Sequence, residues 1–127
     1  DMVLTFRNVH NWAKAGSVEA MFTGFAKALK PGGILGLVEH RAKAGTPLEK
    51  QMKSGYMTED YVIQMAKDAG FRLDAKSEIN ANPKDTADHP KGVWNLLPGL
   101  RGVADNDKAN IISIGESDRM TLRFIKE

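Results

Sequence analysis

Residues Val18 to His40 read VEAMFTGFAKALKPGGILGLVEH, and the other predicted elements are arranged around them. Its first half predicts an amphipathic helix, because apolar side chains recur with the helical period at Val18, Met21, Phe22, Phe25, Ala26 and Leu29. Ser17 is the expected N-cap, since its hydroxyl can accept a hydrogen bond from an amide of the first turn. Pro31 cannot continue the helix, and Gly32-Gly33 permits the positive φ that turns the chain back.

The second half of this stretch predicts a buried strand. Ile34 to Val38 is a short, nearly continuous apolar run, which is typical of a parallel strand covered on both faces. Three ionisable residues, Glu39, His40 and Arg41, follow it directly. Ligand sites of open α/β sheets lie beyond the carboxyl ends of the strands. The stretch therefore predicts half of an α/β unit with a candidate site at its end.

Further elements extend this unit in both directions. Met2 to Phe6 reads as a strand and Arg7 to Trp12 as a polar loop, so that strand, helix and strand form a right-handed βαβ unit. Thr58 is the expected N-cap of a second helix, which ends before Gly70. Alternation of apolar and polar residues predicts two later strands, at Phe71 to Ile79, nearer the sheet edge, and at Met120 to Ile125.

Two stretches carry weaker patterns. Leu48 to Met52 is expected to form a helical turn. Asn80 to Asp118 holds three prolines, which predicts an irregular insertion, with a short helix at Asp105 to Ile114 capped by Asp105.

The composition indicates a single domain and argues against several classes of partner. The chain has 127 residues, 42% hydrophobic and 27% charged, as globular domains do. Its net charge of +2 is too small to indicate a nucleic-acid partner, and the basic residues between His40 and Lys53 are expected to be a solvated loop. No apolar run approaches the ~18 residues of a membrane helix, so no membrane partner is expected. The lack of cysteine fits either an oxidising or a reducing compartment.

Several segments resemble a known family. Ala28 to Leu35 is similar to the helix-turn-strand of class I S-adenosylmethionine-dependent methyltransferases, and Asn8 to Trp12, Ser54 to Tyr61 and Gly115 to Met120 resemble a bacterial subgroup of predicted methyltransferases. The order of the elements matches as well. The resemblance spans essentially the whole chain. It implies an α/β, partial Rossmann-like methyltransferase fold with strands four to seven in the order 4-5-7-6, the last strand antiparallel, and helices on one face.

The departure from the family concerns its cofactor, S-adenosyl-L-methionine. The family binds it with a glycine-rich loop after strand one and an acidic residue after strand two, and neither is present. Gly32-Gly33 precedes a strand, so it is not that loop. Because the chain opens in mid-strand, we expect it to be the C-terminal part of a longer protein or a truncated reading frame. The main cofactor-binding half is expected upstream of Asp1, and this fragment alone is expected to be inactive.

The first candidate site residues follow the first strand, where the family lines the pocket near the transferable methyl group. Arg7 and Asn8 are the candidates for contacting the cofactor. His10 is a candidate general base, or a loop histidine that bonds its own backbone. Trp12 is a candidate substrate-binding residue that could wall off the sulfonium through cation–π contact, with core packing as the favoured alternative.

The second set follows the buried strand. Glu39 and His40 are candidate catalytic residues and Arg41 a candidate substrate ligand, because ionisable groups there are costly unless they line a cleft or pair with each other. An Arg41–Glu39 ion pair is the structural alternative.

The third set lies near or within the insertion, which is interpreted as a substrate lid or as a cap over exposed sheet. Its candidate substrate-binding residues are Tyr56, Trp94, Glu116, Asp118 and Arg119. No metal is expected, since His10, His40 and His89 lack ligand spacing.

Two functions follow from these observations. The first is the substrate-side half of a methyltransferase that acts on a small molecule. The second is a non-catalytic, self-associating half-domain that lacks the cofactor-binding loop. In both cases a homodimer is expected, joined along Met2 to Phe6 or across the bare face of the sheet, because an unpaired apolar edge is a template for another chain.

Overall fold

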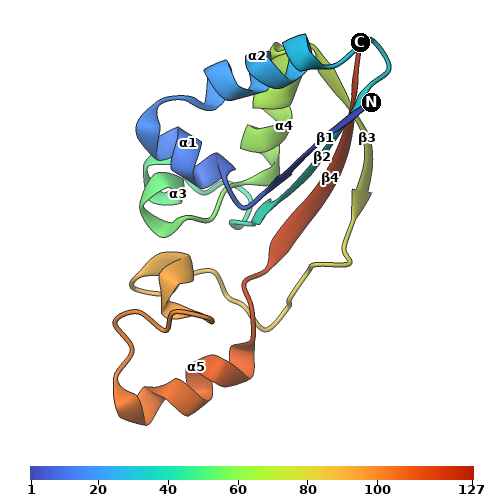
Figure 1. The fold of residues 1–127 in the computed structure, drawn as a ribbon. Coiled ribbons are helices and arrows are strands. Elements are labelled where there is room, and N and C mark those ends of the chain that lie inside the picture. The colour runs from blue at the N-terminus through green and yellow to red at the C-terminus, as the bar shows by residue number, and fades with distance from the viewer.

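The computed structural model describes all of residues 1–127 and contains one mixed sheet. Its strands are β1 (Met2–Phe6), β2 (Ile34–His40), β3 (Phe71–Ser77) and β4 (Arg119–Lys126), in the order β1-β2-β4-β3 (Figure 1). β1 and β2 are parallel, whereas β4 is antiparallel to both of its neighbours. β3 lies at an edge, as its alternating pattern predicts. The α/β class is confirmed; the numbering of these strands within a larger sheet stays a prediction.

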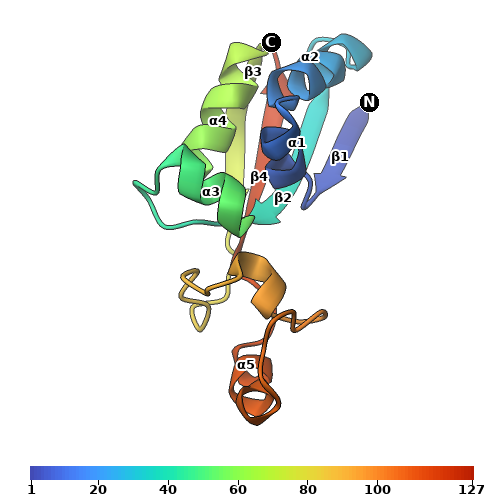
Figure 2. The same ribbon diagram turned by 90° about the vertical axis from the view of Figure 1, so that its left-hand side faces the viewer.

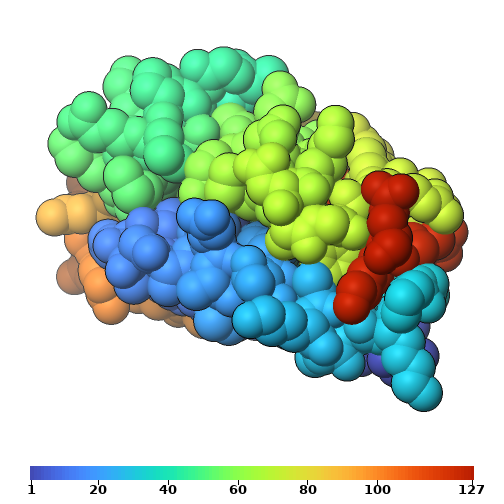
Figure 3. Space-filling view, turned by 90° about the horizontal axis from the view of Figure 1, so that it is seen from above, coloured from blue at the N-terminus to red at the C-terminus, as the bar shows by residue number.

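Four helices cover one face of the sheet, as Figure 2 shows. They are α1 (Val9–Ala15), α2 (Val18–Ala28), α3 (Leu48–Ser54) and α4 (Glu59–Asp68). Seen from above, the blue α1–α2 segment and the green α3–α4 segment lie side by side (Figure 3). Between these helices and the sheet, the core buries Phe22, Leu35, Phe71 and Phe124 almost completely. None of the helices has the length and apolar character needed to cross a membrane.

The two predicted helices are confirmed, but only one N-cap forms as expected. The Thr58 hydroxyl accepts the Tyr61 amide at 3.2 Å. Ser17 stands at the N-cap of α2, yet its hydroxyl donates to the carbonyl of Trp12 instead of accepting an amide. In the turn after α2, only Gly32 has a positive φ, of 83°. Gly33 is needed for space, since a Cβ there would lie 2.9 Å from the Lys30 carbonyl oxygen.

The prediction of a polar loop from Arg7 to Trp12 is wrong, because α1 begins at Val9. Val9 and Ala13 lie one turn apart and are both buried in the core. Gly16, with a φ of 71°, ends the helix in the left-handed conformation. Seven residues are too few for the helical period to stand out among the polar residues between them.

The sheet face opposite the helices is bare. Met2, Leu4 and Phe6 are 57%, 57% and 55% exposed. The prediction that Ile34 to Val38 is covered on both faces is therefore wrong for this chain, since the side chains of Ile34 and Val38 are only half-buried.

The insertion does not cover this face, because it lies beyond the carboxyl end of β2 (Figure 1). It contains two 3₁₀ turns, Gly92–Asn95 and Asp105–Asp107, and α5 (Lys108–Ile114). Asp107 occupies the N-cap of α5 and makes no side-chain capping bond, so the predicted cap at Asp105 is wrong.

Candidate functional site

A buried carboxylate at the end of β2 gathers three donors. Oε2 of Glu39 accepts the main-chain amide of His10 at 2.8 Å, and Oε1 accepts that of His40 at 2.9 Å. Nδ1 of His10 lies 3.0 Å from both oxygens. Since a carboxylate only accepts, Nδ1 donates here, and Nε2 of the neutral ring remains an acceptor. A histidine oriented by a carboxylate in this way is the arrangement of a general base.

His40 completes the cluster as a neutral imidazole. Its ring lies 5.2 Å from that of His10, centroid to centroid, and its Nδ1 is hydrogen-bonded to the hydroxyl of Ser117. Burial, followed by the charges of His10, Arg119 and Arg7, lowers the pKa of His40 to about 3. His40 is therefore uncharged near neutral pH, and its contact with His10 involves no repulsion between two imidazolium ions.

The structure thus brings together the three predicted catalytic residues, although their roles stay predictions. β1 and β2 are parallel neighbours, so the segments that follow them lie at the same end of the sheet, the carboxyl end of these two strands. His10 comes from the first turn of α1, and Glu39 and His40 end β2. Ser117 was not predicted. It lies between the candidates Glu116 and Asp118 and two residues before Arg119, the β4 residue that pairs with His40.

The same three residues offer ligand atoms within 4.8 Å of one another, which suits a metal ion by distance alone. Both oxygens of Glu39, however, already accept main-chain amides of His10 and His40. A cation on these oxygens would have to share them with two main-chain amides or displace those amides, and leaving a buried amide unpaired is costly. The hydrogen bonds therefore favour the carboxylate–imidazole dyad, and the absence of a metal stays a prediction.

Arg41 joins the sheet to the insertion. Its Nε and Nη2 donate to the two carboxylate oxygens of Asp118 at 3.0 and 2.9 Å, and Nη1 donates to Glu78 at 2.8 Å. These hydrogen bonds raise the pKa of Arg41 further above its ordinary value, and the bond with Asp118 has the largest effect. The alternative of an Arg41–Glu39 pair is wrong. Arg41 and Asp118 thus form a clamp that holds the insertion against the sheet, and a role of either residue in binding a substrate stays a prediction.

Tyr56 belongs to the same clamp. Its hydroxyl donates to Asp85 at 2.8 Å, and burial raises the pKa of Tyr56 well above its usual value, so the phenol stays protonated. Asp85 was not predicted as a site residue. It also accepts hydrogen bonds from the main-chain amide of Asp118 and from a ring nitrogen of His89, each at 2.8 Å. The insertion is therefore held at the strand ends by buried polar contacts.

Two candidates after β1 have different surroundings. The Trp12 ring packs against Phe22 and Phe25, with ring centroids 6.4 and 5.6 Å away, as the packing alternative expects, and its role in binding a substrate stays a prediction. Asn8 is the exposed N-cap residue of α1, and its side chain accepts a weak hydrogen bond from Asn11.

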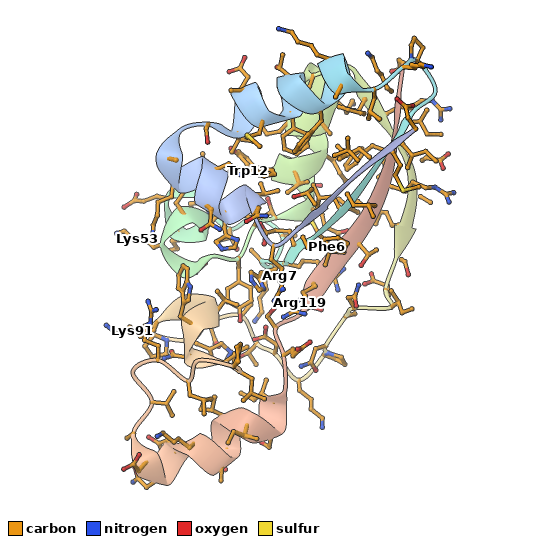
Figure 4. All side chains as sticks on the ribbon, viewed as in Figure 1. Phe6, Arg7, Trp12, Lys53, Lys91 and Arg119 are labelled. Atoms are coloured by element: carbon orange, nitrogen blue, oxygen red, sulfur yellow. The ribbon has the colours of Figure 1, made fainter.

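The remaining candidates surround a cavity of about 230 Å³ between the strand ends and the insertion. Arg7, His40, Trp94 and Arg119 line it. In Figure 4, Arg7 and Arg119 lie next to each other below the end of the sheet. Glu116 does not line this cavity and is joined to it through an ion pair with Arg119.

Comparisons with known proteins identify the fold. No protein-family model and no curated protein matches the chain. Among solved structures, a "putative S-adenosylmethionine dependent methyltransferase" from Listeria monocytogenes matches with a TM-score of 0.53 and 15% sequence identity, over 99% of this chain and 61% of that chain. At this identity the likeness shows a shared fold. The chain spans less than two thirds of the length of that protein.

The residues present fit only one edge of a site for the methyltransferase cofactor. Arg7 and Asn8 join β1 directly to α1, and this turn contains no glycine. It therefore offers no glycine-rich cradle at a helix N-terminus. Arg7, Asn8 and His10 are the residues that could border the cofactor.

Proposed function

We propose that the chain is the acceptor side of an S-adenosylmethionine-dependent methyltransferase of the bacterial subgroup it resembles, acting on a small molecule. In this proposal its strands correspond to strands four to seven, in the C-terminal half of that fold. The observation that carries it is the His10–Glu39 dyad at the carboxyl ends of two parallel strands. The carboxyl ends of the strands are where α/β sheets bind ligands. The fold is also shared with a structure described as a putative S-adenosylmethionine-dependent methyltransferase.

The proposed roles follow from the hydrogen bonds. Nε2 of His10 takes the proton of an acceptor N–H or O–H group, while Glu39 orients the ring and stabilises the imidazolium that forms. His40, kept neutral, closes one side of the site. The cofactor, when bound, would supply an electrophilic methyl group. Because this chain borders only one edge of it, we assign no transfer step to the chain alone and propose that it is inactive by itself.

Calorimetric titration of the chain with S-adenosylhomocysteine tests this proposal. An enzyme half with one edge of the cofactor site is expected to bind it weakly and saturably. Complete absence of heat, with the chain folded, would favour the second candidate function.

The second candidate is a non-catalytic half-domain that self-associates. The exposed apolar side chains of Met2, Leu4 and Phe6 on edge strand β1 favour it. We propose that two copies of the chain pair with two-fold symmetry along β1 or across the bare sheet face. Self-association is compatible with either function, and neither requires a nucleic-acid or membrane partner.

A further inference from the structure

The cavity beside His40 has a strongly one-sided charge. Of its ten lining residues three are arginines, Arg7, Arg101 and Arg119, and none is acidic. The two that flank His40, Arg119 and Arg7, are close enough for their charges to disfavour its protonation. A concave site with several cations and no carboxylate of its own attracts anions.

Two of these arginines have no partner within the chain. Four of the six arginines make ion pairs, namely Arg41, Arg72, Arg119 and Arg123. Arg7 and Arg101 make none, and their guanidinium groups make no hydrogen bond. Arg119 uses Nε for Ser117 and Nη1 for the exposed Glu116, so that its Nη2 remains available. The cavity thus presents three guanidinium groups with unused donors.

The backbone of Arg7 is held in an uncommon conformation. Its φ is 56°, in the left-handed region that few residues other than glycine adopt. Its amide donates to the carbonyl of Val38 at 2.7 Å, which fixes the start of the segment that crosses from β1 to α1. Such strain persists where the surrounding structure imposes it, and it is concentrated at ligand clamps.

The rest of the cavity is mostly apolar, and two of its lining side chains contact His10. Val93, Trp94, Leu96 and Leu97 form its wall on the insertion side. Trp94 lies edge-on to the His10 ring with 6.1 Å between centroids, and His40 lines the cavity while contacting His10 from another side. A ligand with its anionic end on the arginines therefore has its apolar body against Trp94 and His40, the two lining side chains that contact the His10 ring.

We infer that this cavity binds the carboxylate of the methyl acceptor, a small carboxylic acid with an apolar body. The identity of the ligand as the acceptor rests on the proposed function; the recognition of an apolar acid rests on the cavity alone. Arginine suits this role because its planar donors match a carboxylate in a bidentate manner. Docked in this way, the acid has its apolar body against Trp94 and His40.

Fluorine NMR of 4-fluorobenzoate with the unmodified chain tests the inference without any cofactor. We expect saturable broadening of the fluorine signal, and at least about tenfold weaker binding of 4-fluorobenzamide, which has the same shape and no charge. Arg7→Gln and Arg101→Gln should each weaken binding of the acid several-fold and leave the melting temperature unchanged, because neither side chain has an internal partner. Arg72→Gln removes the same charge at the far end of the sheet and should bind as the unmodified chain does.

Three results would overturn the inference. They are equal binding of acid and amide, absence of binding to the folded chain, and equal behaviour of the Arg7→Gln and Arg72→Gln variants. Displacement of 4-fluorobenzoate by S-adenosylhomocysteine would overturn it as well, since the arginines would then hold the carboxylate of the cofactor. If the unmodified chain binds 4-fluorobenzoate but not S-adenosylhomocysteine, the proposed function would be contradicted and the recognition of an apolar acid would stand.

Discussion

Nδ1 of His10 lies 3.0 Å from each carboxylate oxygen of Glu39, and the main-chain amide of the same histidine donates to Oε2 at 2.8 Å. The side chain and the backbone of one residue are thus fixed by a carboxylate 29 positions away. Through this contact the first turn of α1 is anchored to the end of β2. The dyad is therefore both a candidate catalytic device and part of the folded framework.

Glu39→Gln is expected to lower the free energy of unfolding by about 1–3 kcal/mol, because the new amide group places a donor against a buried main-chain N–H. Urea denaturation measures this change. Glu49→Gln is the matched control, since Glu49 is exposed and should change stability by less than about 0.5 kcal/mol. Equal stability of the two variants would show that the buried carboxylate makes no net contribution.

His40 is expected to make the chain acid-sensitive. Its pKa is about 3 in the folded state and near 6.5 when unfolded. Between these values the unfolded chain binds more protons, so stability is fully present above about pH 6.5 and falls as the pH is lowered toward 3. From about pH 7 to about pH 5, the unmodified chain should lose about 1–2 kcal/mol more than His40→Asn, as measured by urea denaturation. Parallel losses in both proteins would assign the sensitivity to other groups.

Gly92 is expected to be essential for docking of the insertion. A Cβ there would lie 2.2 Å from the carbonyl oxygen of Ser54, and its φ is 63°. Gly92→Ala should therefore cost about 2 kcal/mol or more. Gly24→Ala is the opposite control, because Gly24 lies within α2 with open space around it and alanine should stabilise the helix by about 0.5–1 kcal/mol. Thermal unfolding compares the two. A harmless Gly92→Ala would mean that the insertion is not packed against α3.

Local signals predicted much of the fold, and long-range contacts account for most of what was missed. The cap at Thr58 and the turn at Gly32 depend on neighbouring residues, and both were predictable from them. α1 was missed because seven residues are too few to establish a helical period. The bare face could not be read from β2, since an apolar strand reads alike whether or not a second layer covers it.

In the candidate site, too, some contacts could be predicted from the sequence and others could not. The rule that the carboxyl ends of parallel strands lie at the same end of a sheet was enough to predict that His10 and Glu39 are close together. The partners that fix the insertion were out of reach. Tyr56 and Asp85 are 29 positions apart, and His40 and Ser117 are 77 apart, so their contacts depend on the path of an irregular segment that carries no periodic pattern.

Self-association is expected at micromolar concentration, because the apolar side chains of β1 are exposed on an edge strand. Light scattering should report a dimer. Leu4→Lys should yield a monomer, since it places a charge in the proposed contact, whereas Leu48→Lys on α3 should not, although Leu48 is also exposed. A monomer for the unmodified chain would leave the bare face to a partner of another kind, such as a preceding segment of a longer protein.

The most direct test of the proposed methyltransferase site is a titration of the isotopically labelled chain with S-adenosylhomocysteine, followed by amide NMR. We expect weak, saturable shifts at Arg7, Asn8 and His10, which lie between β1 and the first turn of α1 beside the proposed cofactor site. Amides of β3 should not move, since that strand is the opposite edge of the sheet. A folded chain whose Arg7–His10 amides do not shift at saturating cofactor product, or whose shifts fall elsewhere, would contradict the account.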